Sequence, residues 1–176
     1  MKRPSTMPMD VFRFCPRCGS NFSVQDDRSF LCGGCGLHYF INANAAVCAL
    51  IVDLQDRLLL TLRAQDPGRG MLDLPGGFVT PLETAEDALK RELREELNLT
   101  IDSLRYFGSY PNHYLFSGLT IFTLDLAFVC KAKDISGLKP ADDVADAFFI
   151  PLAQVDLGKI AFESIRTVID AYRRCR

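Results

Sequence analysis

Two groups of side chains in this sequence have types and spacings that could do chemistry. One is a set of acidic residues that follows the pair Gly76-Gly77, and the other is a set of cysteines near the start. Most of the acidic set lies in the segment Thr84 to Asn98, whose pattern predicts a helix. At 3.6 residues per turn, three carboxylates fall within an arc of about 100° beside the apolar face of this helix: Glu92, Glu95 and Glu96.

Carboxylates this close to one another favour a bound cation. They repel each other and raise each other's pKa unless a positive charge lies among them. Ligands that are all oxygen select a hard divalent ion such as Mg²⁺ or Mn²⁺. The glycine pair allows close approach of the backbone and could offer a carbonyl to a metal or an amide to a phosphate. The alternative is an ordinary surface helix whose glutamates pair with arginines.

The cysteines form two CxxC pairs separated by thirteen residues, and a glycine follows each pair. Such turns direct four thiolates to one tetrahedral Zn²⁺, and a closed site of this kind is structural because it leaves no open position for catalysis. We predict a zinc ribbon over residues 1–41, which is too short to fold without the metal. A redox CxxC is the alternative. The four predicted zinc ligands are Cys15, Cys18, Cys32 and Cys35.

Composition limits the class of protein. The chain has 176 residues, 48% of them hydrophobic, with 20 basic and 22 acidic side chains, and hence a net charge of −2. This charge balance argues against sequence-independent electrostatic binding to nucleic acid. No apolar run approaches the roughly 20 residues that span a bilayer, so we expect no membrane segment. Seven cysteines without a secretion signal indicate a reducing compartment, and we expect a cytoplasmic protein.

The elements that must position these groups can be outlined from the pattern of apolar residues. A hairpin is predicted from Ala45–Asp53 and Leu58–Leu62. Further strands are expected at Leu104–Ser109, Leu119–Lys131 and Ala147–Ile150, and a closing helix at Lys159–Arg173. In the first helix Thr84 and Asp87 resemble a capping box, and Asn98 suits the left-handed position that ends a helix. The sequence therefore predicts an α+β fold.

The segment from Gly77 resembles the signature of the Nudix hydrolases, G-x5-E-x7-R-E-U-x-E-E-x-G-U, in which U is a bulky aliphatic residue. Gly77, Glu83 and the run Arg91 to Leu99 agree at every fixed position except the last glycine, which is Asn98 here. Asparagine tolerates the same backbone geometry. A zinc ribbon ahead of such a domain is similar to the NADH pyrophosphatase branch. The resemblance implies an α/β/α sandwich, a mixed sheet between helices, over residues 42–176.

The resemblance also implies roles for individual residues. The Gly76 carbonyl and the carboxylates of Glu92, Glu95 and Glu96 would bind Mg²⁺ or Mn²⁺, and Asp143 occupies the place of a further acidic ligand. Glu83 and Arg91 would orient the catalytic loop and helix. Glu95 or Glu96 is a reasonable general base for the attacking water.

The substrate is expected to be a nucleoside diphosphate linked to another moiety, either an NADH- or NAD-like dinucleotide or ADP-ribose. The hallmark of the NADH pyrophosphatase branch, S-Q-P-W-P-F-P-x-S, is matched here at Ser109, Pro111 and Ser117. Tyr110 and Tyr114 could stack on a base, or could simply pack in the sheet. Arg63 and Arg69 are candidates for phosphate contacts.

Two other functions and one assembly state are also considered. The ribbon could serve an RNA-binding or NAD-cap-removing protein, or the domain could be a non-enzymatic nucleotide sensor. The intact set of three glutamates argues against a decayed site. The resemblance further implies a homodimer.

Overall fold

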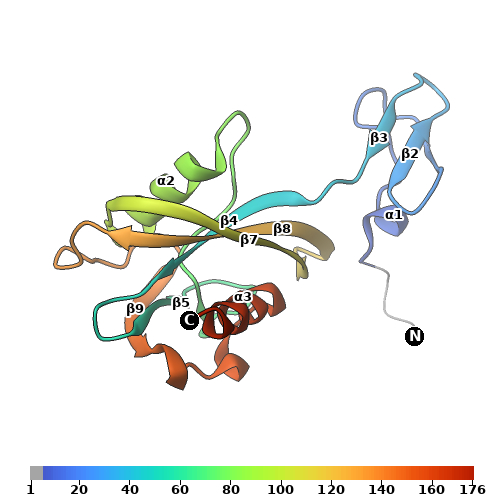
Figure 1. Cartoon of the computed structure of the whole chain (residues 1–176). Helices are drawn as coiled ribbons and strands as arrows, with labels where there is room; N and C mark the ends of the chain where they lie inside the picture. Colours follow the sequence, from blue (N-terminus) through green and yellow to red (C-terminus); the bar gives the residue numbers. More distant parts are fainter. Residues whose placement is uncertain (1–5) are drawn as a thin grey trace. The chain divides into compact units, whose positions relative to one another are not determined.

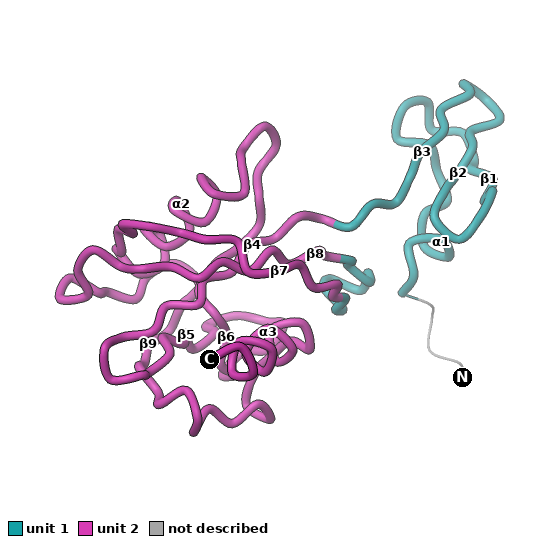
Figure 2. Tube along the Cα trace, in the orientation of Figure 1, with its two compact units in different colours: residues 1–43, 113–122 teal, residues 44–112, 123–176 magenta. Residues whose placement is uncertain are grey.

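The computed structural model describes residues 6–176. The chain forms two compact units, shown in different colours in Figure 2: the first extends to residue 43 and includes residues 113–122, and the second comprises residues 44–112 and 123–176. Residues 1–5, which begin the predicted ribbon and include Lys2 and Arg3, lie outside the described residues.

The first unit contains a short helix and a small antiparallel sheet of order β1-β2-β3. Its elements are α1 (Pro8–Val11), β1 (Phe22–Val24), β2 (Ser29–Cys32) and β3 (His38–Phe40). The core is mostly aromatic: the fully buried Phe30 stacks on Phe22 with ring centroids 5.1 Å apart and also contacts Phe12. The apolar core of this unit is small, which suits a segment predicted to need a metal.

The second unit is built around two three-stranded sheets. The first has the order β4-β8-β7, with β4 (Asn44–Ile51) parallel to β8 (Leu119–Ala132), and its third strand is β7 (Ile101–Phe116). The second is antiparallel, with the order β6-β5-β9, and is formed by β6 (Leu72–Asp73), β5 (Arg57–Arg63) and β9 (Val144–Pro151). The tip of the β7–β8 hairpin belongs to the first unit.

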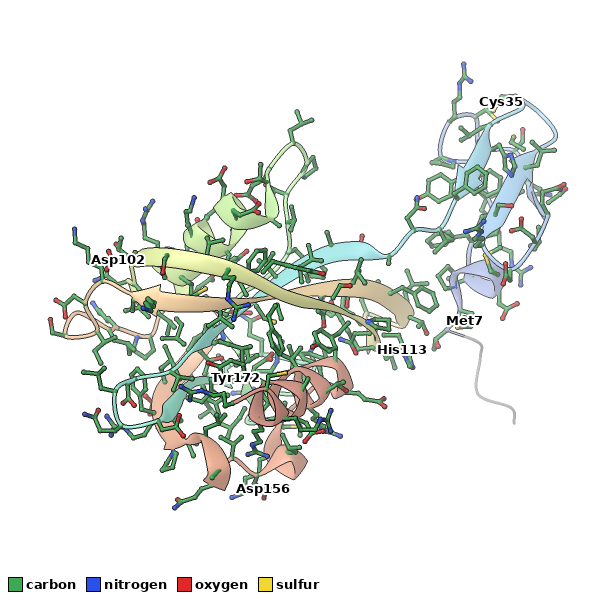
Figure 3. All side chains as sticks on the ribbon, in the orientation of Figure 1. Met7, Cys35, Asp102, His113, Asp156 and Tyr172 are labelled. Carbon is green, nitrogen blue, oxygen red and sulfur yellow. The ribbon has the colours of Figure 1, made fainter. Side chains whose placement is uncertain are left out.

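Two helices cover opposite faces of these sheets (Figure 1): α2 (Ala85–Leu97) and α3 (Glu163–Arg174). Strand β4 alternates between the two cores. Val47, Ala49 and Ile51 pack in the core under α2, whereas Cys48 and Leu50 pack in the core under α3. Tyr172 of α3, labelled in Figure 3, meets Phe107 of β7 edge to face at 5.6 Å. Sheets flanked by helices confirm the predicted α+β class.

The predicted hairpin between residues 45 and 62 is wrong. Strand β4 pairs along its whole length with β8, and it meets the following strand only at a single bridge between Val52 and Leu58. The continuous apolar run that suggested a hairpin strand reflects burial on both faces, which is typical of a parallel strand between two cores.

The predicted ends of α2 are confirmed. Thr84 is the N-cap residue, and its hydroxyl accepts the Asp87 amide. Asn98 ends the helix in the left-handed conformation with φ 54°. Two short 3₁₀ turns, Leu152–Gln154 and Leu157–Lys159, precede α3. Within residues 6–176, no helix combines the length and the apolar character that crossing a bilayer requires.

Candidate active site

Gly76, the first residue of the glycine pair, lies against β4 so closely that no side chain would fit there. The amides of Ala49 and Val47 donate to the carbonyls of Pro75 and Gly77 at 2.9 and 2.8 Å. Gly76 has φ 144°, and a Cβ there would lie 2.1 Å from the Val47 carbonyl oxygen. A Cβ on Gly77 would lie 2.6 Å from the carboxylate of Glu92. The close approach predicted from the glycines is therefore present, and it brings this segment against α2.

Glu96 is the most unusual of the predicted site residues, because its side chain is buried on an otherwise apolar helix face and only 5% of the residue is exposed. The Gly76 amide donates to its Oε2 at 2.9 Å. Burial raises the pKa of Glu96 to about 9, the Gly76 hydrogen bond opposes this rise, and the nearby carboxylates of Asp143 and Glu92 add to it. Burial also raises the pKa of Glu92, against the effect of Arg91.

Arg91 holds the other acidic residues of the motif together. Its Nε and Nη2 each donate to Glu83 at 2.9 Å, and its Nη1 contacts Glu92 at 2.7 Å and Glu95 at 3.0 Å. Its Nη2 also donates to the Phe78 carbonyl at 3.0 Å. This guanidinium therefore fastens the end of the glycine segment to the helix, a geometry that suits the orienting role predicted for Glu83 and Arg91.

The ion pair between Arg91 and Glu83 forms a clamp that holds the loop to the helix, and Glu83 is its acidic residue. Besides Arg91, its Oε2 accepts from the amide and the hydroxyl of Thr80 at 3.1 and 2.9 Å. The hydrogen bond from Arg91 is the largest cause that lowers the pKa of Glu83 to about 2, and the same contact raises the pKa of Arg91. Glu83 is thus held ionised, whereas Glu96 is not.

The remaining acidic residues fit a hard divalent cation. Asp143 lies close enough to raise the carboxyl pKa of Glu92 and Glu96, and Glu92 raises that of Glu96 further. Every side-chain atom that these three residues could offer a metal is an oxygen. The intrahelical pair Arg91–Glu95 also exists, as the surface-helix alternative requires, but that alternative does not explain a buried Glu96. Asp143 immediately precedes β9, and its carbonyl accepts the Ala64 amide at the end of β5. In this arrangement the carboxylates are not gathered as tightly as the cysteines are.

The four cysteines form a compact cluster in the first unit, where Cys35 is labelled in Figure 3. Their sulfur atoms all lie within 4.8 Å of one another, and over residues 6–176 no other set of three or more Cys, His, Asp or Glu ligand atoms is this tight. The Cys15–Cys35 and Cys18–Cys32 sulfurs are 3.7 and 3.4 Å apart. Thiolates bound to a tetrahedral Zn²⁺ lie about 3.8 Å apart, so the residues fit zinc.

The predicted substrate residues fall in different units. Ser109, Tyr110 and Pro111 lie on β7 within the second unit, whereas Tyr114 and Ser117 lie at the hairpin tip of the first. Tyr110 is half-buried and packs against the core under α3, while its two neighbours are exposed. The Tyr110 ring is therefore partly buried by ordinary core packing. The five residues do not form one group within a single unit.

Sequence reasoning missed two buried carboxylates in the second unit. Asp73 forms an ion pair with Arg63, and Asp125 accepts the hydroxyl of Ser164 at 2.5 Å. The one available signal was that each is a lone acidic residue between two leucines in a strand: Leu72-Asp73-Leu74 and Leu124-Asp125-Leu126. An acidic side chain at such a position points to a buried partner.

Comparison with known proteins decides the family. A family model described as the NUDIX domain matches residues 42–171, which is most of the chain. The chain belongs to the Nudix family. The resemblance drawn from the residues Gly77 to Leu99 is therefore confirmed, and the family is one of hydrolases.

Relatives of this Nudix protein carry two kinds of name. The NAD-capped RNA hydrolase NudC of Vibrio atlanticus is 29% identical over 164 residues, which cover 92% of this chain and 59% of the relative. The ADP-ribose pyrophosphatase of Methanocaldococcus jannaschii is 33% identical over 130 residues, which cover 70% of each protein. The chain spans about half the length of the NudC relatives it matches.

A solved structure supports the fold. The crystal structure of a NUDIX hydrolase from Nitrosomonas europaea has a TM-score of 0.72 at 22% identity and covers 94% of this chain and 92% of its own. At this identity the likeness shows that the Nudix fold is shared.

Proposed function

We propose that this Nudix protein hydrolyses the pyrophosphate bond of a nucleoside diphosphate linked to another moiety, either an NADH- or NAD-like dinucleotide or ADP-ribose. The observation that carries the proposal is the buried Glu96 carboxyl on the Gly76 amide, with Glu92 and Asp143 beside it. Buried carboxyl groups of raised pKa are typical of catalytic sites. The names of the NudC and ADP-ribose pyrophosphatase relatives support this substrate class.

In the proposed mechanism the chain's own groups hold the cation and move the proton. Glu92, Glu95, Glu96 and the Gly76 carbonyl would hold Mg²⁺ or Mn²⁺, and Asp143 would bind it directly or through water. When bound, such an ion neutralises phosphate charge and acidifies a water molecule. Glu95 or Glu96 would accept the proton of the attacking water. The Arg91–Glu83 clamp would keep the helix and the glycine segment in register during this step.

A nucleotide panel tests the proposal. The protein is incubated with Mg²⁺ and NADH, NAD⁺, ADP-ribose or ATP, and the products are identified by mass. We expect cleavage between the two phosphorus atoms, which yields two nucleoside monophosphates from a dinucleotide, or AMP and ribose 5-phosphate from ADP-ribose. If neither the dinucleotides nor ADP-ribose yield these monophosphates with Mg²⁺ or Mn²⁺, the proposal is wrong.

A second candidate is removal of an NAD cap from RNA, which the names of several relatives favour. The same pyrophosphate bond would be cleaved, and the ribbon would contact the RNA. We expect weak retention of RNA, given the net charge of −2. Retention that falls steeply with salt, together with faster cleavage of capped RNA than of free NAD⁺, would favour this candidate over a small-molecule hydrolase.

We also propose a homodimer, on the resemblance to the NADH pyrophosphatase branch. Sedimentation at micromolar concentration should give a mass near twice the 19.7 kDa of one chain. A single species of one chain's mass would contradict this.

A further inference from the structure

Arg63 and Asp73 form a buried ion pair in the second unit, apart from the acidic residues of the proposed site. The Nη1 of Arg63 lies 2.8 Å from Oδ2 of Asp73, and the side chains are only 19% and 10% exposed. A charged pair removed from water persists only where its geometry is good and its other polar atoms are satisfied.

Both side chains also contact neighbouring parts of the chain. The Nε of Arg63 donates to the Pro67 carbonyl at 2.7 Å, and its guanidinium lies 4.8 Å over the Phe162 ring at the start of α3. The other carboxylate oxygen of Asp73 accepts the Leu74 amide at 2.9 Å. The Arg63 guanidinium is therefore occupied by contacts within the protein, and it is a poor candidate for the phosphate contact that the sequence suggested.

The pair lies directly before the segment that meets Glu96. Strand β6 is only two residues long, and further backbone hydrogen bonds join Met71 to Arg63 and Leu72 to Ala161. After Asp73 the chain continues through Leu74 and Pro75, both buried, to Gly76, whose amide holds Glu96. The amides of Ala49 and Val47 hold Pro75 and Gly77, on either side of that glycine, against β4, and Asp73 is where the segment leaves β5. The side-chain pair therefore adds a second anchor to this segment, three residues before Gly76.

We propose that Arg63 and Asp73 are positioning residues of the proposed metal site: together with the hydrogen bonds from β4, they set the Gly76 backbone against Glu96. The inference rests on the proposed function, because it assigns these residues to the site where the divalent cation would bind. Residues that hydrogen-bond a metal's ligands typically change its affinity about 10- to 100-fold when they are removed. Arg63 and Asp73 act through the three residues of backbone that lead to Gly76, so we expect an effect near the lower end of that range, about tenfold.

The chain contains a matched control at the other end of β5. Arg57 lies 2.7 Å from Asp53, and its guanidinium lies 5.6 Å from the Phe149 ring centroid, so it repeats the ion pair and the ring contact of Arg63 at a more exposed position. This pair closes the turn between β4 and β5 and has no path to Gly76 as short as that of Asp73. Loss of the Arg57–Asp53 pair should lower the free energy of unfolding without changing the position of the metal ligands.

The test compares Asp73→Asn with Asp53→Asn. Mn²⁺ is titrated into the zinc-loaded wild-type protein and both variants, and free Mn²⁺ is followed by its paramagnetic resonance signal. Thermal midpoints are measured alongside. We expect Asp73→Asn to weaken Mn²⁺ binding about tenfold or more and Asp53→Asn to leave it unchanged. Arg63→Lys keeps the charge but loses the forked geometry, and it should weaken binding in the same direction if Asp73→Asn does not fold.

Each outcome decides between specific claims. Wild-type affinity in Asp73→Asn, or an equal loss in both variants, would overturn the positioning role. An unchanged Mn²⁺ affinity with a raised KM for substrate in Arg63→Lys would instead make Arg63 a phosphate contact. If the wild-type protein binds no Mn²⁺ and cleaves no pyrophosphate, the proposed function itself fails. If it cleaves the substrate and only the difference between variants is absent, only this inference fails.

Discussion

Two glutamates of the same motif carry opposite protonation preferences. Hydrogen bonds from Arg91 and Thr80 lower the pKa of Glu83 to about 2, whereas burial raises the pKa of Glu96 to about 9. At neutral pH without metal, Glu83 is therefore ionised and Glu96 is protonated. This difference separates a residue that clamps the loop from one that would give up its proton to bind a cation.

The clamp predicts a pH-dependent stability. The folded pKa of Glu83 is below its unfolded value of about 4.5, so its contribution is present above that pH and is lost as the pH falls towards 2. Glu83→Gln should unfold at lower urea than the wild type at pH 7, and the gap should narrow between pH 4.5 and 2. Chemical denaturation at a series of pH values measures this. A gap that stays constant down to pH 2.5 would mean that the charge of Glu83 contributes nothing. Glu86→Gln, at an exposed position in the first turn of α2, serves as the control.

What the sequence could predict at this scale depended on how local the signal was. The spacing from Gly77 to Leu99 identified the motif without any structure, because its residues share one loop and one helix. The lone acidic residues Asp73 and Asp125 in leucine strands indicated burial but not their partners Arg63 and Ser164, which lie elsewhere in the chain. Their burial depends on tertiary packing, which a single sequence without homologues does not reveal.

Among the helices and strands too, the features set by neighbouring residues were predicted and those set by distant residues were not. Helix α2 was predicted to within a residue at each end because Thr84 and Asn98 act on their own neighbours. Strand β4 was given the wrong partner because its true partner, β8, lies far along the chain (Asn44 pairs with Thr123), and pattern alone cannot distinguish the two pairings. The start of α3 shows a third case, in which the N-cap residue Phe162 offers no side-chain cap.

We predict that Asp125 stabilises the start of α3 in place of a cap. Its buried carboxylate accepts the Ser164 hydroxyl at 2.5 Å, close to the positive end of the helix dipole. Ser164→Ala would leave this carboxylate without that donor and should lower the free energy of unfolding by about 1–3 kcal/mol. Thr167→Ala removes an exposed hydroxyl on the same helix and should cost less than about 0.5 kcal/mol. Equal effects of the two substitutions, measured by urea denaturation, would refute the role of Asp125.

At the scale of the whole molecule, the two units depend on different sources of stability. The second unit has two apolar cores that face α2 and α3. The first has a few aromatic rings around Phe30 and the four-cysteine cluster. The metal should therefore matter to the fold of the first unit and not to the chemistry of the second.

This division predicts the effect of losing one zinc ligand. Cys18→Ser should lower the zinc content, measured by atomic absorption, and should reduce solubility or thermal stability before it affects turnover. Cys175→Ser, an exposed cysteine outside the cluster, should change none of these. A metal-free Cys18→Ser protein of normal stability would show that the cluster is not a structural zinc site.

The substitution Glu96→Gln tests the central claim most directly. Glutamine keeps the size of the side chain and an oxygen that can accept the Gly76 amide, but it cannot provide a carboxylate to a cation or take a proton. Pyrophosphate cleavage with Mg²⁺ is measured for Glu96→Gln and for Lys90→Gln, which lies exposed on the same helix and pairs with Asp87. We predict that Glu96→Gln loses more than about 10²- to 10⁴-fold in turnover while its thermal midpoint without metal holds or rises, and that Lys90→Gln retains the wild-type rate. Turnover of Glu96→Gln near the wild-type rate would contradict the assignment of this carboxylate cluster as the catalytic centre.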